Sequence, residues 1–128
     1  MVLSFAFFAA LALSALGVVV TIRAGRRGDR RSHLRRALAT VVLLVVAVVL
    51  ALMLGEVRTF PEGTMAIHRF LARTTGVLVL AVVSTGILLW RRPKWRVVHR
   101  GLVYTLVVVM VAAIGTGTWA FLMSTPKE

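Results

Sequence analysis

The chain has 128 residues, the length of one ordinary domain, but its composition excludes a typical water-soluble protein. Hydrophobic residues make up 59% of the sequence and the mean hydropathy is +0.93, whereas soluble domains are ~45–50% apolar. The net charge of +12 does not indicate a nucleic-acid partner, because each arginine cluster abuts a long apolar segment. The absence of cysteine excludes disulfides and thiolate metal ligands.

Four apolar segments follow one another along the chain, at residues 2–22, 37–55, 70–90 and 101–123. Each is close to the ~20 residues that a helix needs to cross ~30 Å of hydrocarbon. The connections are short, which favours antiparallel neighbours. The sequence therefore predicts an all-α fold, a four-transmembrane-helix up-down bundle that forms one integral membrane domain over residues 1–128. The first segment lacks the basic start of a signal peptide, so we expect an uncleaved span.

The three connections differ in composition. Residues 23–36, RAGRRGDRRSHLRR, form a polar linker that contains glycine, and residues 91–100 form a second basic connection. Residues 56–66 are expected to turn at Pro61 and Gly63. The first and third connections are therefore expected on one side of the membrane, and the second on the other.

Basic residues are distributed unequally over these two sides. Four lie at the second connection or in the C-terminal tail with Glu128, and twelve lie at the other two connections. Lysine and arginine mark the cytoplasmic side, so we expect a multi-pass protein of a bacterial-type cytoplasmic (inner) membrane with both termini outside. Anionic lipid headgroups are the expected partners of the inner clusters. The twelve inner residues are Arg23, Arg26, Arg27, Arg30, Arg31, Arg35, Arg36, Arg91, Arg92, Lys94, Arg96 and Arg100.

A repeat links the third and fourth apolar segments. HRFLARTTGVLVLAVVSTG begins at His68, and HRGLVYTLVVVMVAAIGTG begins at His99. Each histidine is followed by Arg at +1, Leu at +3, Thr at +6 and Thr-Gly at +17 and +18. In antiparallel helices, seventeen residues correspond to ~26 Å, so His68 should lie level with Gly117 and His99 with Gly86. A glycine opposite each ring leaves room for a flat group.

The third histidine, His33, precedes the second apolar segment on the same side as His99. Two imidazoles from different helices at one depth are a common frame for haem ligation, so we expect His33 and His99 to bind haem b, or copper, together. On the outer side His68 is the remaining candidate ligand, with Glu56, Met53 and Met65 near its level. The alternative is that the repeat serves helix packing and that the histidines are solvated flanking residues.

No enzyme motif is visible: the sequence has no carboxylate pair, no nucleophile beside a base and no glycine loop for phosphate. We therefore expect that the protein is not an enzyme.

Several motifs resemble a known family. The resemblance is carried by IRAGRRGDRRSHLRRALA, a histidine at the start of the third span, RRPKWRVVHRG, and TG near the end of the fourth span. In these motifs the chain resembles the small membrane family that includes the CtaM-type factors for cytochrome oxidase maturation. The resemblance covers nearly the whole chain and implies that His33, His68 and His99 match three of the family's histidines. It also implies a role in haem-copper oxidase assembly, by handling haem or copper, with a respiratory membrane complex as partner.

One region departs from the family. A further histidine is usual near the outer end of the second span, where this chain reads LALMLGEVRTF and Glu56 takes roughly that place. The departure weakens a second cofactor site on the outer side. Two other functions stay open: a small b-type cytochrome that transfers electrons, and an accessory membrane subunit without a cofactor.

Overall fold

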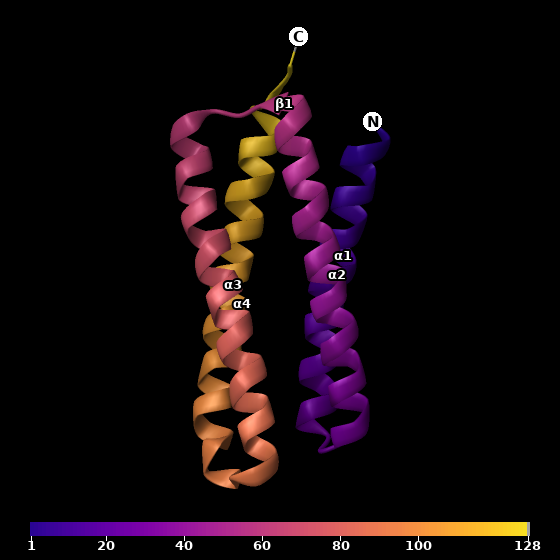
Figure 1. The fold of residues 1–128 in the computed structure, drawn as a ribbon, viewed down its shortest axis with the longest axis vertical. Helices are drawn as coiled ribbons and strands as arrows, with labels where there is room; N and C mark the ends of the chain where they lie inside the picture. The colour runs from indigo at the N-terminus through magenta and orange to yellow at the C-terminus, as the bar shows by residue number, and fades with distance from the viewer. Residues whose placement is uncertain (128) are drawn as a thin grey trace. The chain divides into compact units, whose positions relative to one another are not determined.

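The computed structural model describes residues 1–127 and is almost entirely helical (Figure 1). Glu128 lies outside the described residues. By length and composition each of the four long helices could cross a membrane, so the prediction of an all-α protein with four long apolar helices is confirmed. The elements are α1 (Val2–Arg26), α2 (Arg30–Val57), β1 (Arg58–Thr59), α3 (Glu62–Arg91), the 3₁₀ turn η1 (Pro93–Trp95), α4 (Arg96–Leu122) and β2 (Thr125–Pro126).

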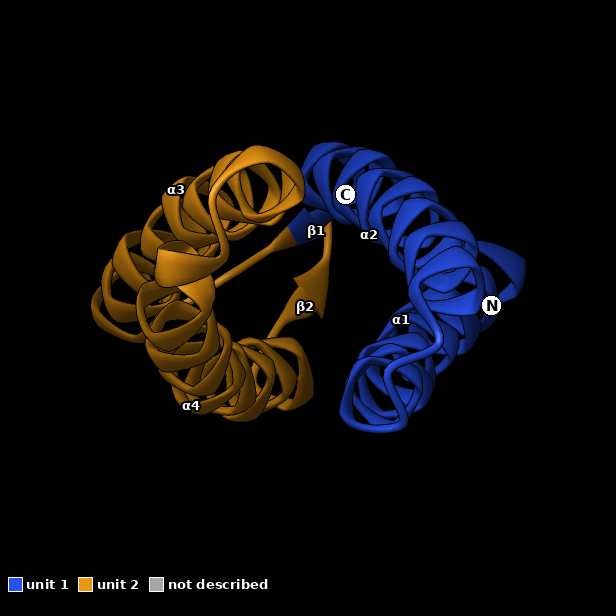
Figure 2. Ribbon diagram, turned by 90° about the horizontal axis from the view of Figure 1, so that it is seen from below, with its two compact units in different colours: residues 1–58 blue, residues 59–128 orange. Residues whose placement is uncertain are grey.

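The chain divides into two compact units, Met1–Arg58 and Thr59–Glu128 (Figure 2). Unit 1 contains α1 and α2, and unit 2 contains α3, η1 and α4. In each unit the two long helices pack against each other along an antiparallel seam. β1 pairs with β2. Each unit is described by itself, and the arrangement of residues 1–128 as one domain stays a prediction.

The expected linker at residues 23–36 is wrong in extent, because most of it is helical. α1 continues to Arg26 and α2 begins at Arg30. Gly28 adopts a φ of 74°, which favours glycine and reverses the chain within a few residues. The Asp29 carboxylate then accepts the Ser32 N–H through Oδ1 at 3.0 Å, which caps the start of α2.

The expected outer turn at residues 56–66 is also shorter than predicted. α2 ends at Val57 and α3 begins at Glu62, so Gly63 lies inside the first helical turn. Pro61 is the N-cap of α3 with extended backbone angles. Proline is compatible with a helix start because the first N–H groups of a helix have no intrahelical acceptor.

The contact between helices follows a seven-residue spacing in both units. Successive seam positions of α2 are His33, Thr40, Ala47 and Leu54; those of α4 are His99, Leu106, Ala113 and Ala120. The six residues that follow the histidines in these two lists are buried. A seven-residue repeat keeps one face against a neighbouring helix with a small left-handed crossing angle, and small residues allow close approach.

Unit 1 shows how close the helices come. A Cβ added at Gly17 would lie 2.6 Å from Thr40 Oγ1, so only glycine fits at this point of α1. The Thr40 hydroxyl donates to Arg36 O at 2.7 Å and lies 3.3 Å from Thr21 Oγ1. Polar groups within this seam are thus satisfied inside the helix pair, as a low-dielectric environment requires.

Candidate functional site

All three histidines lie half-buried on the seams, and each ring faces a glycine of the neighbouring helix. Two of these contacts are in unit 2, one near each end of the helix pair, and the third is in unit 1 beside the α1–α2 turn. The predicted facing of histidine and glycine in the third and fourth helices is confirmed. The pairs are His68 with Gly117, His99 with Gly86, and His33 with Gly25.

The tightest contact is that of His68, in the second turn of α3. A Cβ at Gly117 would lie 2.7 Å from Cε1 and 2.9 Å from Nδ1 of the ring. Nδ1 is 3.0 Å from the carbonyl oxygen of Ala113, one helical turn before Gly117 on α4. Glycine therefore makes the space that lets this ring reach the α4 backbone.

His99, in the first turn of α4, makes a looser contact with α3. A Cβ at Gly86 would lie 3.4 Å from Cε1, close to ordinary van der Waals contact. Its Nδ1 is 3.1 Å from Thr85 Oγ1. The Thr85 hydroxyl itself donates within α3, 2.8 Å from Ala81 O and 3.1 Å from Val82 O. The Thr-Gly pair of the repeat thus supplies both an acceptor and a space for the ring.

The contact of the His33 ring with a glycine was not predicted from the sequence. It lies in the first turn of α2, and a Cβ at Gly25 of α1 would be 3.0 Å from its Nδ1. Nδ1 is also 3.0 Å from Thr21 O. His33 is therefore not the solvated flanking residue of the alternative left open above, because the helical start of α2 turns its ring onto α1. The available signal was a glycine just before a three-residue turn and a histidine just after it.

The hydrogen bonds determine the tautomer of two of the three rings. A carbonyl oxygen only accepts, so Nδ1 of His33 and of His68 carries the hydrogen and donates. His99 Nδ1 bonds the Thr85 hydroxyl, a group that can donate to the ring or accept from it, so both ring tautomers are compatible with this contact. In the neutral rings of His33 and His68, Nε2 then holds the lone pair. Histidines that bind metals through Nε2 commonly have their Nδ1–H held in this way.

The donor set limits which cofactor fits. Within residues 1–127, no group of three or more His, Asp or Glu side chains is placed to hold a metal ion. Haem iron receives four nitrogens from the porphyrin and needs only one or two from the protein. An isolated histidine is therefore compatible with haem ligation.

The predicted ligand combinations extend over both units. His33 belongs to unit 1 and His99 to unit 2, so their pairing on one cofactor stays a prediction. Glu56 and Met53 are exposed on α2 in unit 1, whereas His68 and Met65 lie on α3 in unit 2. Within each unit, every histidine ring has its own contact with a glycine and its own hydrogen bond through Nδ1.

No protein-family model, no curated protein and no solved structure matches this chain. The likeness to the oxidase maturation family therefore rests on the motifs themselves.

Proposed function

We propose that the protein spans a bacterial-type cytoplasmic membrane four times, with both termini outside. The support is its outward-facing surface: Phe5 of α1, Leu38 of α2, Leu80 of α3 and Val108 of α4 are 66–78% exposed within this chain. Long helices that present large apolar side chains all round belong in lipid, since water would drive them to aggregate. The basic residues then mark the α1–α2 and α3–α4 turns as cytoplasmic.

Reporter fusions at Glu128 test this topology. A reporter that is active only outside the cytoplasm is expected to work there, and one placed after Arg92 is expected not to. A cytoplasmic C-terminus would contradict the assignment.

Within that membrane frame, the function that the site supports best is haem handling during assembly of a haem-copper oxidase. The observation that carries it is that three rings are each held through Nδ1 within a helix pair, which leaves the lone pair of neutral His33 and His68 on Nε2. All three histidines have an arginine within two residues of the sequence, and guanidinium groups are suited to bind haem propionates. When bound, haem would supply a redox-active iron; a histidine would provide a nitrogen ligand, and the neighbouring arginines would neutralise the propionates.

A second candidate, an accessory subunit without a cofactor, is favoured by the same contacts. A ring that bonds a carbonyl or hydroxyl across a seam joins two helices, and such bonds contribute ~0.6 kcal/mol on average in a membrane. In this case the function of each ring would be the hydrogen bond of Nδ1 that joins the two helices, and Nε2 would bind no cofactor. The two candidates therefore differ in which ring nitrogen matters.

Substitution by asparagine separates the two nitrogens. The asparagine amide can replace Nδ1–H as donor but has no group at the place of Nε2. The full chain in mild detergent would be titrated with haem b, and the absorbance spectrum followed for wild type, His33→Asn, His68→Asn and His99→Asn. The proposal expects weak or substoichiometric haem that passes to an apo-acceptor, and loss of the haem spectrum in at least one variant with little change in Tm.

Each other result has a clear meaning. Stoichiometric, tightly held low-spin haem would identify a b-type cytochrome instead. No haem spectrum, with a lowered Tm in the asparagine variants, would identify the accessory subunit. Metal analysis of the same samples would reveal copper as the bound species and replace haem in the proposal.

A further inference from the structure

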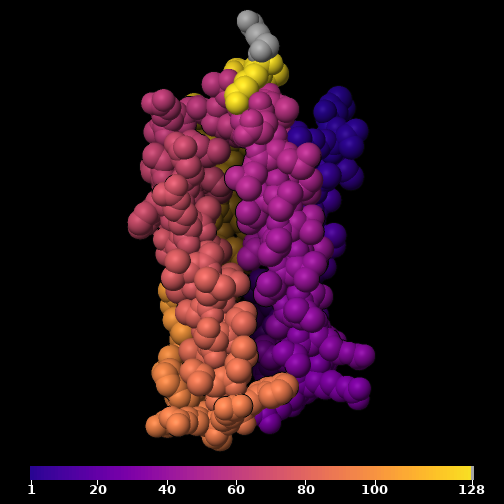
Figure 3. Space-filling model, in the orientation of Figure 1, coloured from indigo at the N-terminus to yellow at the C-terminus, as the bar shows by residue number. Residues whose placement is uncertain are grey.

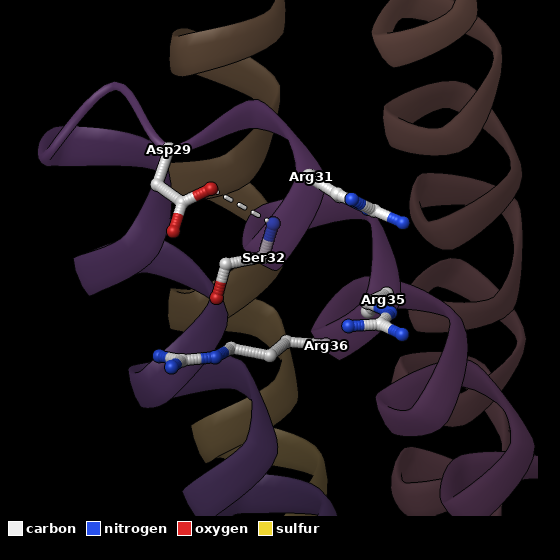
Figure 4. A pocket seen from close by; sticks show the side chains of 5 residues that line it. All are labelled: Asp29, Arg31, Ser32, Arg35 and Arg36. Atoms are coloured by element: carbon white, nitrogen blue, oxygen red, sulfur yellow. Dashed lines mark hydrogen bonds between the residues drawn. The ribbon is translucent and has the colours of Figure 1, made fainter.

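The first two turns of α2 concentrate like charge at the surface. A hollow there is lined by Arg31, Arg35 and Arg36 together with Ser32 and Asp29 (Figure 4). Arg31 and Arg35 are one turn apart, exposed, and point to the same side of α2, and we call them the arginine pair. Arg36 extends the other way, with Nη1 3.5 Å from Val20 O of α1. In the space-filling view, side chains near the α1–α2 turn stand out from unit 1 (Figure 3).

The charge of the arginine pair is not balanced within unit 1. Asp29, the acidic residue at this turn, uses Oδ1 to cap α2 through the Ser32 N–H. Within residues 1–127, the side chains of Arg31 and Arg35 form no hydrogen bond and no ion pair. Like charges four residues apart destabilise a helix, and positive charge in the first turns also opposes the helix macrodipole. A bound anion would reverse both effects.

The position of the arginine pair selects the kind of anion. The apolar run of α2 begins at Ala37, so the pair precedes it by ~3–9 Å along the helix axis. In a bilayer the headgroup layer adds ~5–8 Å on each side of a ~30 Å hydrocarbon core. In a membrane-spanning protein, Arg31 and Arg35 therefore lie at the level of the lipid phosphates.

We propose that Arg31 and Arg35 bind the phosphate of an anionic phospholipid headgroup on the cytoplasmic side. This inference rests on the proposed membrane insertion and is independent of haem. The planar guanidinium suits phosphate oxygens because it donates two parallel hydrogen bonds. Two guanidinium groups one helical turn apart can hold neighbouring oxygens of one headgroup, and the acyl chains would then run along the apolar surface of α2.

The other basic turn provides a matched control. Arg91 is the last residue of α3 and Arg92 is its C-cap, so both lie at the negative end of a helix macrodipole. Their charge is partly compensated without a ligand. Arg31→Gln/Arg35→Gln and Arg91→Gln/Arg92→Gln each remove two positive charges from the same protein, but only the first removes an uncompensated pair.

Native mass spectrometry of the full chain in neutral detergent measures the binding. Phosphatidylglycerol and phosphatidylcholine with the same acyl chains would be titrated into wild type and both double variants. Wild type is expected to prefer phosphatidylglycerol. Each arginine beside an anionic headgroup contributes about fivefold in affinity, so R31Q/R35Q should weaken binding by on the order of 25-fold. R91Q/R92Q should change binding by less than about fivefold.

Several results would overturn the proposal: equal losses in the two double variants, no preference for phosphatidylglycerol over phosphatidylcholine, or equal competition by soluble glycerol phosphate. Binding of an RNA oligonucleotide that depends on Arg31 and Arg35, with unchanged lipid binding, would also overturn it. Circular dichroism checks that each variant is folded. If R31Q/R35Q does not fold, Arg31→Lys/Arg35→Lys keeps the charge but loses the forked geometry, and unchanged lipid binding in that variant would overturn the paired site. Reporter fusions decide membrane insertion separately.

Discussion

Units 1 and 2 are both antiparallel helix pairs, but they use glycine differently. In unit 2 each glycine contact on the seam receives an imidazole, at Gly86 near the α3–α4 turn and at Gly117 toward the opposite end. In unit 1 one glycine, Gly25, receives the ring of His33, and the other, Gly17, receives the hydroxyl of Thr40. Close approach at glycine is therefore the common design, and the polar group placed in the gap is what varies.

The same difference explains why only unit 2 shows a sequence repeat. An antiparallel pair exchanges its ends, so a histidine near the start of each helix meets a Thr-Gly or glycine near the end of the other. Because unit 2 has two such contacts, α3 and α4 each carry a histidine near the start and a Thr-Gly pair near the end. Unit 1 has a single histidine, so its two helices do not share a pattern. The repeat thus reflects the geometry of a helix pair.

The largest expected effect is at the tightest contact. Gly117→Ala places a Cβ 2.7 Å from His68 Cε1, so the ring must move away from α4 and lose its bond to Ala113 O. Overpacking of this kind costs about 1–3 kcal/mol, measured as the free energy of unfolding in detergent. Gly115→Ala is the control, since no atom lies within 4 Å of a Cβ there. Equal stability of these two variants would show that the His68 contact is not a tight one.

A smaller loss is expected at the turn that is particular to unit 1. Asp29 caps α2, whereas the start of α4 has no side-chain cap at Trp95. Asp29→Ala should lower the free energy of unfolding by about 1 kcal/mol. Asp29→Asn removes the charge but keeps a capping oxygen, so it should retain most of the stability. If Asn were as damaging as Ala, charge neutralisation among the arginines, and not the cap, would account for the loss.

The smallest effect is expected at Gly86, where unit 2 is most tolerant. A Cβ there lies 3.4 Å from His99 Cε1, so alanine needs almost no movement of the ring. Since alanine favours a helix over glycine by up to about 1 kcal/mol, Gly86→Ala should be neutral or slightly stabilising, like the open control Gly76→Ala. A loss as large as that of Gly117→Ala would contradict the ranking of the two contacts in unit 2.

The sequence by itself determined the helices and the pairing of levels in unit 2. Apolar segments of membrane length, bounded by arginines, predict four helices, and the rise per residue is enough to place His99 beside Gly86 and His68 beside Gly117. The ends of α1 and α2 could not be predicted from composition, because the segment around them is polar throughout. Within that segment Gly28 turns the chain after α1, and Asp29 caps the start of α2.

Only the tertiary structure decided which way each ring points. A helix that is apolar around its whole circumference has no polar side by which its packed face could be told from its other faces. The rotation of α1 and α2 that brings His33 onto Gly25, and Thr40 onto Gly17, was therefore not readable from hydropathy. The Nδ1 hydrogen bonds that determine the tautomer of His33 and His68 depend on helix rotation and on backbone carbonyls, which every residue carries alike. Sequence thus named the candidate ligands, and packing decided which of their nitrogens holds the lone pair.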